Sequence, residues 1–347
     1  MVTLDGREGE GGGQVLRSAL SLSLITGTPF RLEHVRAKRR PPGLKAQHLA
    51  CVIGAAEVGH ARVEGGELGS RTVEFHPGPV RAGDFSLDVG TAGATSLLLQ
   101  CLTYPLALAG GGTLTLRGGT HVSMSPPFEY LTHGWARALA AYGLDVQVWL
   151  KSAGFYPQGG GALQARVEPP RAVDAGDVAW PTAQVTEALV LSCAGGLPVH
   201  VASRQADAAR EVLAAAGLRV EVEARRLEAK HSRGSSVLVV GLGEGGLPVA
   251  SSALGERGKP AERVGQEAAR GFLAELKHGG SCDEHLGDQL LFPAALAACG
   301  RLGARRTTRF NAAQVTEHLT THARVLEQFL PVVVEIDGAR GVTVRPR

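Results

Sequence analysis

One layout recurs three times along the chain, and it restricts the fold more than any other feature of the sequence. Each copy begins with a glycine-rich turn and a strongly apolar helix. It continues through a strand, a polar loop, a second helix and a pair of strands. The copies span residues 9–78, 88–169 and 279–347. The sequence therefore predicts three β-α-β-α-β-β units, although the opening strand of the third unit is unclear.

A single unit of this size is too small to bury both faces of its helices. Three units packed together can bury them, so we expect one large α+β domain built from residues 1–183 and 277–347. The composition agrees, since 47 glycines against 9 Phe, 4 Tyr and 3 Trp predict many tight turns around a core of Leu, Val and Ala.

Residues 184–276 follow a different order and predict a smaller α/β domain inserted into the larger one. The pattern predicts a strand at 197–203, a helix at 205–217, strands at 218–224 and 235–243, and a helix at 260–280. A divergent fourth unit is the alternative. The insert is favoured because its order of helices and strands differs from that of the three units.

Charge and cysteine content exclude several classes of protein. The chain has 347 residues, with 36 Lys and Arg against 33 Asp and Glu, so its net charge of +3 excludes a polycation of the histone type. No apolar run approaches the ~20 residues of a membrane span, and the charged start MVTLDGREGEGGG does not resemble a secretion signal. Five scattered cysteines without a CxxC pair predict reduced thiols in the cytoplasm and no structural zinc site.

The glycine-rich turn of the first unit, GREGEGGGQVLR, is a candidate anion site, because such a turn before a helix exposes backbone N–H groups. It lacks the Gly-Lys-Ser/Thr of a P-loop. Glu10, Gln14 and Arg17 have the spacing i, i+4, i+7 and would share one helix face. A carboxylate, an amide and a guanidinium there suit a phosphate and a metal ion. A helix start with solvated polar residues is the alternative.

The segment RLEHVRAKRRPPGLKAQHLA gathers positive charge on a loop that two prolines keep extended. Guanidinium groups on a stiff loop bind phosphates well. No aromatic residue is interleaved, so the pattern favours a site for a few phosphates over a long nucleic-acid track. A solvated basic loop remains the alternative. The basic residues are Arg31, Arg36, Lys38, Arg39, Arg40 and Lys45.

Two polar groups interrupt apolar helices in the second and third units. Gln100 lies within an otherwise apolar helix, where a buried amide needs a partner in the protein or in a ligand. The segment SCDEHLGDQL, residues 281–290, places acidic groups and an imidazole at a helix start. The helix dipole alone would stabilise carboxylates there. A nucleotide and metal site is the functional interpretation.

His318 and His322 lie one helical turn apart in QVTEHLTTHARVLEQFL. Two such histidines can bind zinc, but Glu317 precedes the first histidine instead of following it as in zincins, and no third ligand is evident. A histidine can also attack phosphorus as a nucleophile. A satisfied core histidine is the third possibility.

Taken together, these segments resemble the RNA 3′-terminal phosphate cyclase family, over nearly the whole chain. In this order and spacing the motifs are highly specific. They are LDGREGEGGGQVLRSALSLSLITG, VRAKRRPPGLKAQHL, GFYPQGGG, LGERGKPAERVGQEAA, HLGDQL and TEHLTTHARVLEQFLP.

The resemblance implies a large domain of three repeated units and an insert of thioredoxin-like topology. It also implies an ATP-dependent conversion of an RNA 3′-phosphate end to a 2′,3′-cyclic phosphodiester. In the family, this reaction passes through a covalent histidine–AMP and an RNA–adenylate, and it releases pyrophosphate and AMP. A divalent metal, Mg²⁺ or Mn²⁺, and RNA 3′-phosphate ends are the implied partners. A homodimer is compatible with the resemblance.

The resemblance assigns the nucleophile to His318 and a metal-binding role to Glu10. It assigns nucleotide binding to Gln100, His285, Leu286, Gly287, Asp288 and Gln289. It assigns the substrate phosphate to Arg17, Arg36, Arg39 and Gln47.

This chain departs from many bacterial members of the family at two positions and from several relatives at a third. It has His285 where they have tyrosine, and Gly287 where they have alanine. His322 replaces an asparagine of several relatives. The presence of His318 disfavours a non-catalytic ribosome-assembly branch of the family, which lacks that histidine. An enolpyruvyl transferase and a pure RNA-binding module are two further possibilities.

Overall fold

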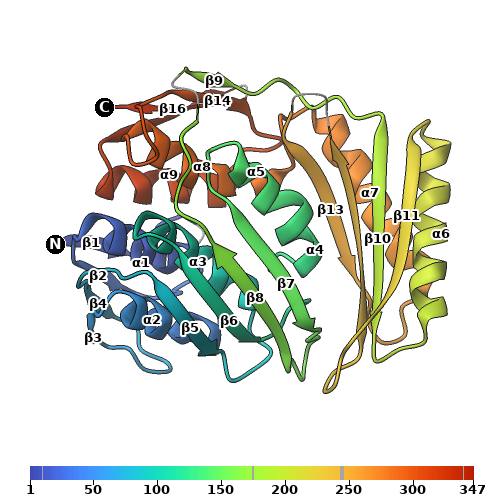
Figure 1. Ribbon diagram of the computed structural model, residues 1–347, viewed down its shortest axis with the longest axis horizontal. Coiled ribbons are helices and arrows are strands. Elements are labelled where there is room, and N and C mark those ends of the chain that lie inside the picture. Colours follow the sequence, from blue (N-terminus) through green and yellow to red (C-terminus); the bar gives the residue numbers. More distant parts are fainter. Residues whose placement is uncertain (10, 174–175, 243–245, 339) are drawn as a thin grey trace.

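The computed structural model describes residues 1–9, 11–173, 176–242, 246–338 and 340–347. They form a mixed fold of helices and four four-stranded sheets, which agrees with the predicted α+β class (Figure 1). Three of the sheets share one connectivity, and the fourth stands apart on the right of Figure 1. No described helix is both long and apolar enough to cross a membrane.

The first sheet has the strand order β1-β2-β4-β3. Its first two strands are parallel, so a helix must connect them, and its last two are antiparallel to their neighbours. The helices between the strands are α1 (Gln14–Thr26) and α2 (Ala46–Val58). The strands are β1 (Val2–Asp5), β2 (Phe30–Glu33), β3 (Arg62–Glu64) and β4 (Val73–His76).

The second sheet repeats this pattern in the order β5-β6-β8-β7. Its strands are β5 (Gly83–Asp88), β6 (Gly112–Gly118), β7 (Val146–Ser152) and β8 (Gly161–Val167). Its helical segments are α3 (Thr95–Leu108), α4 (Phe128–Tyr130), the π-turn η1 (Leu131–Trp135) and α5 (Ala136–Ala140).

The third sheet has the order β9-β14-β16-β15, again with a parallel first pair. Its opening strand, unclear from the sequence, is the two-residue β9 (Val178–Ala179), which precedes the whole fourth sheet along the chain. The remaining elements are α8 (Glu284–Ala298), β14 (Thr308–Asn311), α9 (Glu317–Phe329), β15 (Val332–Ile336) and β16 (Gly341–Pro346).

The fourth sheet has a different order, β11-β10-β12-β13, with both of its helices packed against it. The strand predicted at 197–203 is wrong, since α6 begins at Val199, directly after Pro198. Proline suits the start of a helix, and the strand lies earlier in the chain. The elements are β10 (Glu187–Gly195), α6 (Val199–Ala215), β11 (Arg219–Leu227), β12 (Gly234–Leu242), β13 (Pro248–Leu254) and α7 (Ala261–His278).

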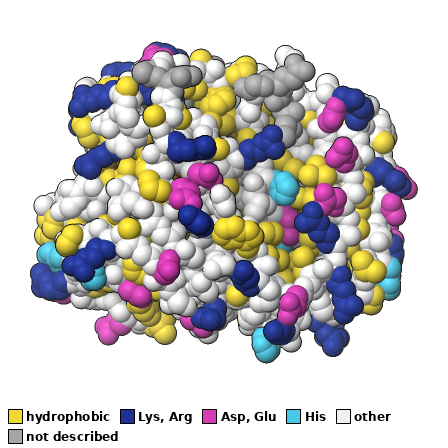
Figure 2. Space-filling model, viewed as in Figure 1, with side chains coloured by type: hydrophobic (Ala, Val, Ile, Leu, Met, Phe, Trp, Pro, Cys, Tyr) yellow, Lys and Arg dark blue, Asp and Glu magenta, His cyan; other side chains and the backbone are white. Residues whose placement is uncertain are grey.

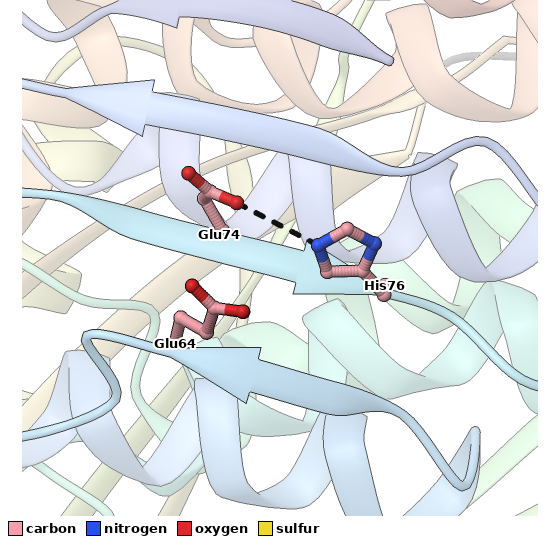
Figure 3. A group of neighbouring side chains, drawn as sticks. All are labelled: Glu64, Glu74 and His76. Atoms are coloured by element: carbon pink, nitrogen blue, oxygen red, sulfur yellow. Dashed lines mark ion pairs between the residues drawn. The ribbon is translucent and has the colours of Figure 1, made fainter.

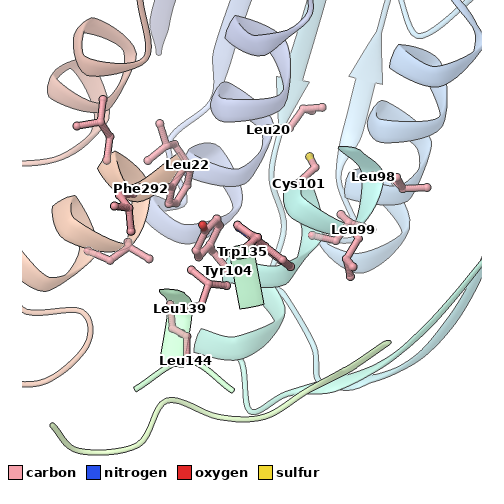
Figure 4. Packing of buried hydrophobic residues seen from close by; sticks show 14 of the residues in the cluster. Leu20, Leu22, Leu98, Leu99, Cys101, Tyr104, Trp135, Leu139, Leu144 and Phe292 are labelled. Carbon is pink, nitrogen blue, oxygen red and sulfur yellow. The ribbon is translucent and has the colours of Figure 1, made fainter. Parts of the chain in front are cut away.

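The main core is built where α1, α3, η1 and α8 converge (Figure 4). Tyr104 of α3 stacks on Phe292 of α8 with ring centroids 4.2 Å apart, and Trp135 of η1 is 1% exposed. Each fully buried large apolar side chain contributes roughly 1.5–3 kcal/mol, so these helices are held firmly against one another. A second cluster lies between the fourth sheet and its helices α6 and α7.

A buried polar network joins the segment around α4 to the fourth sheet. Glu129 accepts a hydrogen bond from His121, at 2.9 Å from Nε2, and one from the thiol of Cys193 on β10, at 3.3 Å. Although burial opposes ionisation, the charge and hydrogen bond of His121 lower the pKa of Glu129 to about 2. Breaking such a pair would leave a buried charge, so the network fixes how the two parts pack.

The surface in Figure 2 carries basic and acidic side chains side by side, without one dominant field of either sign. All five cysteines are free. Both observations agree with the small net charge and the absence of a disulfide framework in the sequence.

Candidate active site

A cavity of about 660 Å³ lies where α1, α3, α8 and α9 meet β13 and the segment 122–127. Elements associated with all four sheets contribute to its walls. Six of the predicted site residues line it, namely Arg17, Gln100, His285, Asp288, Gln289 and His318.

A chain of hydrogen bonds holds His318. Its Nδ1 lies 2.9 Å from Oε1 of Gln14, and Nε2 of Gln14 donates to Oδ1 of Asp288 at 2.6 Å. A carboxylate only accepts hydrogen bonds, so Asp288 orients the Gln14 amide with its oxygen towards His318. That oxygen then accepts a hydrogen from Nδ1. In the neutral ring, the lone pair is therefore on Nε2.

Asp288 remains ionised in this environment. Burial alone would raise its pKa, but the hydrogen bond from His322, the nearby His318 and the Gln14 amide together hold it below the ordinary value. The anion therefore keeps accepting from Gln14 at neutral pH, and the amide keeps its orientation.

Two glutamines meet across the cavity wall. Gln100 on α3 is half-buried, and its Nε2 donates to Oε1 of Gln289 on α8 at 3.0 Å, so its amide has a partner within the protein. His285, at the start of α8, is largely exposed, with 72% of its side chain accessible, and lies near Glu284 at 3.7 Å. Its ring is thus available at the rim of the cavity.

Three of the predicted site residues are buried in the protein and do not line the cavity. Leu286 and Gly287 are buried, and Leu286 belongs to the main core. The buried Arg36 donates from its guanidinium to the carbonyls of Pro41 and Gly43, at 3.0 and 2.9 Å, and so braces the basic loop.

Arg39 is exposed on that loop and does not line the cavity either. Gln47, also outside the lining, accepts a weak hydrogen bond from the backbone N–H of Ala94 at 3.5 Å. Glu10 lies outside the described residues.

Positive charge nevertheless gathers at the start of α1. Burial, and then the charges of Arg17, Arg36 and Lys45, lower the pKa of His48 to about 3, so this ring is neutral at pH 7. A Cβ on Gly13 would lie 2.2 Å from the His48 ring and 2.9 Å from the Arg17 guanidinium. A side chain here would collide with both groups, so glycine allows the His48 ring and the Arg17 guanidinium to pack directly against the start of α1.

Sequence reasoning did not place the fourth sheet at this site. Ser252 and Leu254 of β13 and Lys259 of the following loop all line the cavity. Lys259 forms an ion pair with Glu267 of α7. Among the described lining residues, only Lys259 and Arg17 have a lysine or arginine side chain. The sequence motif LGERGKPAERVGQEAA contains Lys259 and could have indicated it, but the motif does not show that this loop lies at the cavity.

Glu64, Glu74 and His76 form a separate group on β3 and β4, with ligand atoms within 4.8 Å of one another (Figure 3). Arg31 pairs with Glu74 and lowers the pKa of its carboxyl. None of the three lines the cavity. Within the group, Glu74 pairs with His76 of its own strand, while Glu64 lies opposite Glu74 and pairs with Arg62.

Comparison with known proteins decides the family. The family model described as RNA 3′-terminal phosphate cyclase matches residues 8–336. The chain belongs to this family.

Relatives named RNA 3′-terminal phosphate cyclase match this chain over almost its entire length. The protein of Methylococcus capsulatus is 43% identical, covering 95% of this chain and 91% of the relative. That of Caldivirga maquilingensis is 40% identical, covering 96% and 94%. That of Methanopyrus kandleri is 39% identical, covering 100% and 99%. This membership agrees with the resemblance seen in the sequence motifs.

Proposed function

We propose that this protein converts RNA 3′-phosphate ends to 2′,3′-cyclic phosphodiesters with ATP as the activating nucleotide. The observation that carries the proposal is the position of His318. Its ring lines the same cavity as Arg17 and the paired glutamines Gln100 and Gln289, with Nδ1 engaged by Gln14. An oriented imidazole beside an open cavity suits nucleophilic attack on phosphorus.

In the first step, Nε2 of His318 attacks the α-phosphorus of ATP, forming a P–N bond and expelling pyrophosphate. The Nδ1 hydrogen stays directed at Gln14 Oε1, which stabilises the positive charge that develops on the ring. Arg17 would neutralise charge on the phosphates. Gln100, Gln289 and the exposed ring of His285 would contact the nucleoside.

In the second step, the P–N bond breaks as AMP passes to the RNA 3′-phosphate, giving an RNA–adenylate anhydride. The 2′-hydroxyl then attacks the 3′-phosphorus, loses its proton, and AMP leaves. This ring closure is intramolecular, so proximity supplies much of the acceleration. The basic loop with Arg36 and Arg39, together with Gln47, would hold the RNA end.

We also propose that Glu10 binds a divalent ion, because carboxylate oxygen is a ligand that Mg²⁺ and Mn²⁺ prefer. When bound, such an ion would offset charge on the phosphates.

We also propose the finer architecture that the family implies. The three sheets of common connectivity would be the repeated units of a catalytic domain, and 184–276 an inserted domain of thioredoxin-like topology. The shared strand orders and the distinct order of the fourth sheet support this division. Free cysteines support a cytoplasmic setting, and a homodimer stays a prediction.

Incubation with α-labelled ATP tests the proposal. Label should remain on the wild-type protein as an acid-labile, alkali-stable adduct, and should be lost in His318→Ala. His200→Ala, which changes an exposed histidine of α6 outside the cavity lining, is the matched control and should label normally. RNA ending in a 3′-phosphate should be cyclised, and RNA ending in a 3′-hydroxyl should not. Labelling that survives His318→Ala would refute the assignment.

A further inference from the structure

His322 lies one turn after His318 on α9, and the proposed reaction gives it no role. It is 6% exposed and lines the cavity. Its Nδ1 lies 3.1 Å from the main-chain oxygen of Asp288 and 3.1 Å from Oδ1 of the same residue. Both oxygens are acceptors, since this carboxyl is ionised, so Nδ1 of His322 must carry the hydrogen.

The second ring nitrogen of His322 supports the same assignment. Nε2 is buried and has no hydrogen-bond partner among the described residues. Because no described residue forms a hydrogen bond with Nε2 while two oxygens face Nδ1, the hydrogen that His322 shares with the protein is the one on Nδ1. The ring of Phe292 lies beside it, with centroids 5.8 Å apart. His322 is thus an Nδ1–H donor to Asp288.

These contacts form one continuous chain. His322 donates to Oδ1 of Asp288, the Gln14 amide donates to the same oxygen, and the Gln14 oxygen accepts from His318. If Asp288 lost the donor from His322, its carboxylate could rotate and release the Gln14 amide. A flipped amide would present its N–H to Nδ1 of His318 and select the opposite tautomer, which has its hydrogen on Nε2.

We propose that His322 is a positioning residue, which acts through Asp288 and Gln14 to keep the lone pair of His318 on Nε2. The proposal rests on the proposed function, because it concerns the nucleophile of that reaction. No proton travels along the chain, since each hydrogen stays on its donor and only the choice of tautomer is transmitted.

Two variants at this position form a matched pair. His322→Asn keeps an N–H donor at the same number of bonds from Cα as Nδ1, so it can still donate to Asp288. His322→Ala removes the donor. Both variants remove the ring that lies beside Phe292. If His322 served only to pack against that ring, both variants should therefore be impaired.

The first experiment needs no activity. Two-bond ¹⁵N–¹H correlation spectra of the full chain with ¹⁵N-labelled histidine distinguish the two tautomers, and the signals of His318 are assigned by their loss in His318→Ala. Wild type and His322→Asn should show the Nδ1–H tautomer of His318. His322→Ala should show a mixture or the Nε2–H form. An unchanged His318 tautomer in His322→Ala overturns the proposal.

The second experiment measures the rate of self-adenylylation against ATP concentration. His322→Ala should lower the rate at saturating ATP by about 10–100-fold, the loss expected when one hydrogen bond to a charged group is removed, with little change in the half-saturating concentration. His322→Asn should recover most of the rate. The proposal is contradicted if both variants lose the same fraction of the rate, or if only the half-saturating ATP concentration changes. If wild type forms no adduct, the proposed function fails, while the tautomer measurement still tests this inference.

Discussion

At the scale of single residues, long-range hydrogen bonds decide what each polar group does. The spacing of Gln14 and Arg17 predicts a shared helix face, and both side chains line the cavity. The contact of Gln14 with His318 joins residues 304 positions apart, so no local pattern could indicate it. The structure thereby changes the interpretation of Gln14 from a phosphate contact to a partner of the imidazole.

The two arginines Arg17 and Arg39 should differ in their effect on the partial reactions. Arg17 lines the cavity with His318, so Arg17→Ala should lower self-adenylylation by about 10–100-fold, the equivalent of one lost charge-assisted hydrogen bond. Arg39→Ala combined with Arg40→Ala should weaken use of the RNA end more than self-adenylylation. Adduct formation and cyclisation of 3′-phosphate RNA are measured separately. Equal loss of both in the loop variant would show that the loop serves ATP.

At the scale of elements, the start of α8 is held by a single carboxylate. Asp283 accepts from the backbone N–H of Leu286 at 2.9 Å, as an N-cap does, and from the Tyr130 hydroxyl at 2.9 Å. It also accepts from the backbone N–H of Ala250 at 3.1 Å, which ties α8 to β13. One residue thus positions the helix that contributes Asp288 and Gln289 to the cavity.

Asp283→Ala should therefore destabilise the protein by about 2–4 kcal/mol. It removes the helix cap and leaves the Tyr130 hydroxyl and the Ala250 N–H buried without their acceptor. Thr316→Ala is the matched comparison, because the Thr316 hydroxyl caps α9 by accepting from the backbone N–H of Leu319 at 3.0 Å. Its expected cost is about 1 kcal/mol. Urea unfolding midpoints measure both. Equal costs would show that the contacts of Asp283 with Tyr130 and Ala250 are unimportant.

At the scale of the whole molecule, the fourth sheet completes the cavity, so its packing against the rest matters for the site. Besides the Glu129 network, α7 meets the start of α8, where the backbone N–H of Glu284 donates to Glu275 at 3.1 Å. Burial, followed by the charges of Asp283 and Glu284, raises the pKa of Glu275 from its ordinary 4.5 to about 7. We therefore expect the stability of this contact to change with pH near 7.

A raised carboxyl pKa means that the folded state favours the protonated form. The resulting stability is complete below pH 4.5 and is lost as pH rises through about 7. Glu275→Gln should remove this loss of stability. The melting temperature of wild type should fall between pH 5 and pH 8 by a few degrees more than that of Glu275→Gln. Glu262→Gln, an exposed change on the same helix where Arg204 lowers the pKa of the carboxyl, should keep the wild-type fall. The same pH slope in wild type and Glu275→Gln would contradict the assignment.

The sequence by itself determined the helices and most strands, because periodicity and glycine turns act over a few neighbouring residues. It failed at 197–203, where alternating valines resemble a strand although Pro198 starts a helix, and it predicted neither β10 nor β13. It also left β9 unclear, since a two-residue strand exists only through its pairing with β14.

The motifs also indicated most of the polar residues of the cavity, including Gln100, Asp288 and His318. Only the tertiary structure decided their partners. It showed that Leu286 packs in the core and that Arg36 stabilises its own loop, so neither lines the cavity. It also brought β13 and Lys259 to the cavity wall. The physical reason is that a hydrogen bond or a cavity wall depends on distances in space, which the packing of the four sheets sets and the spacing along a chain does not.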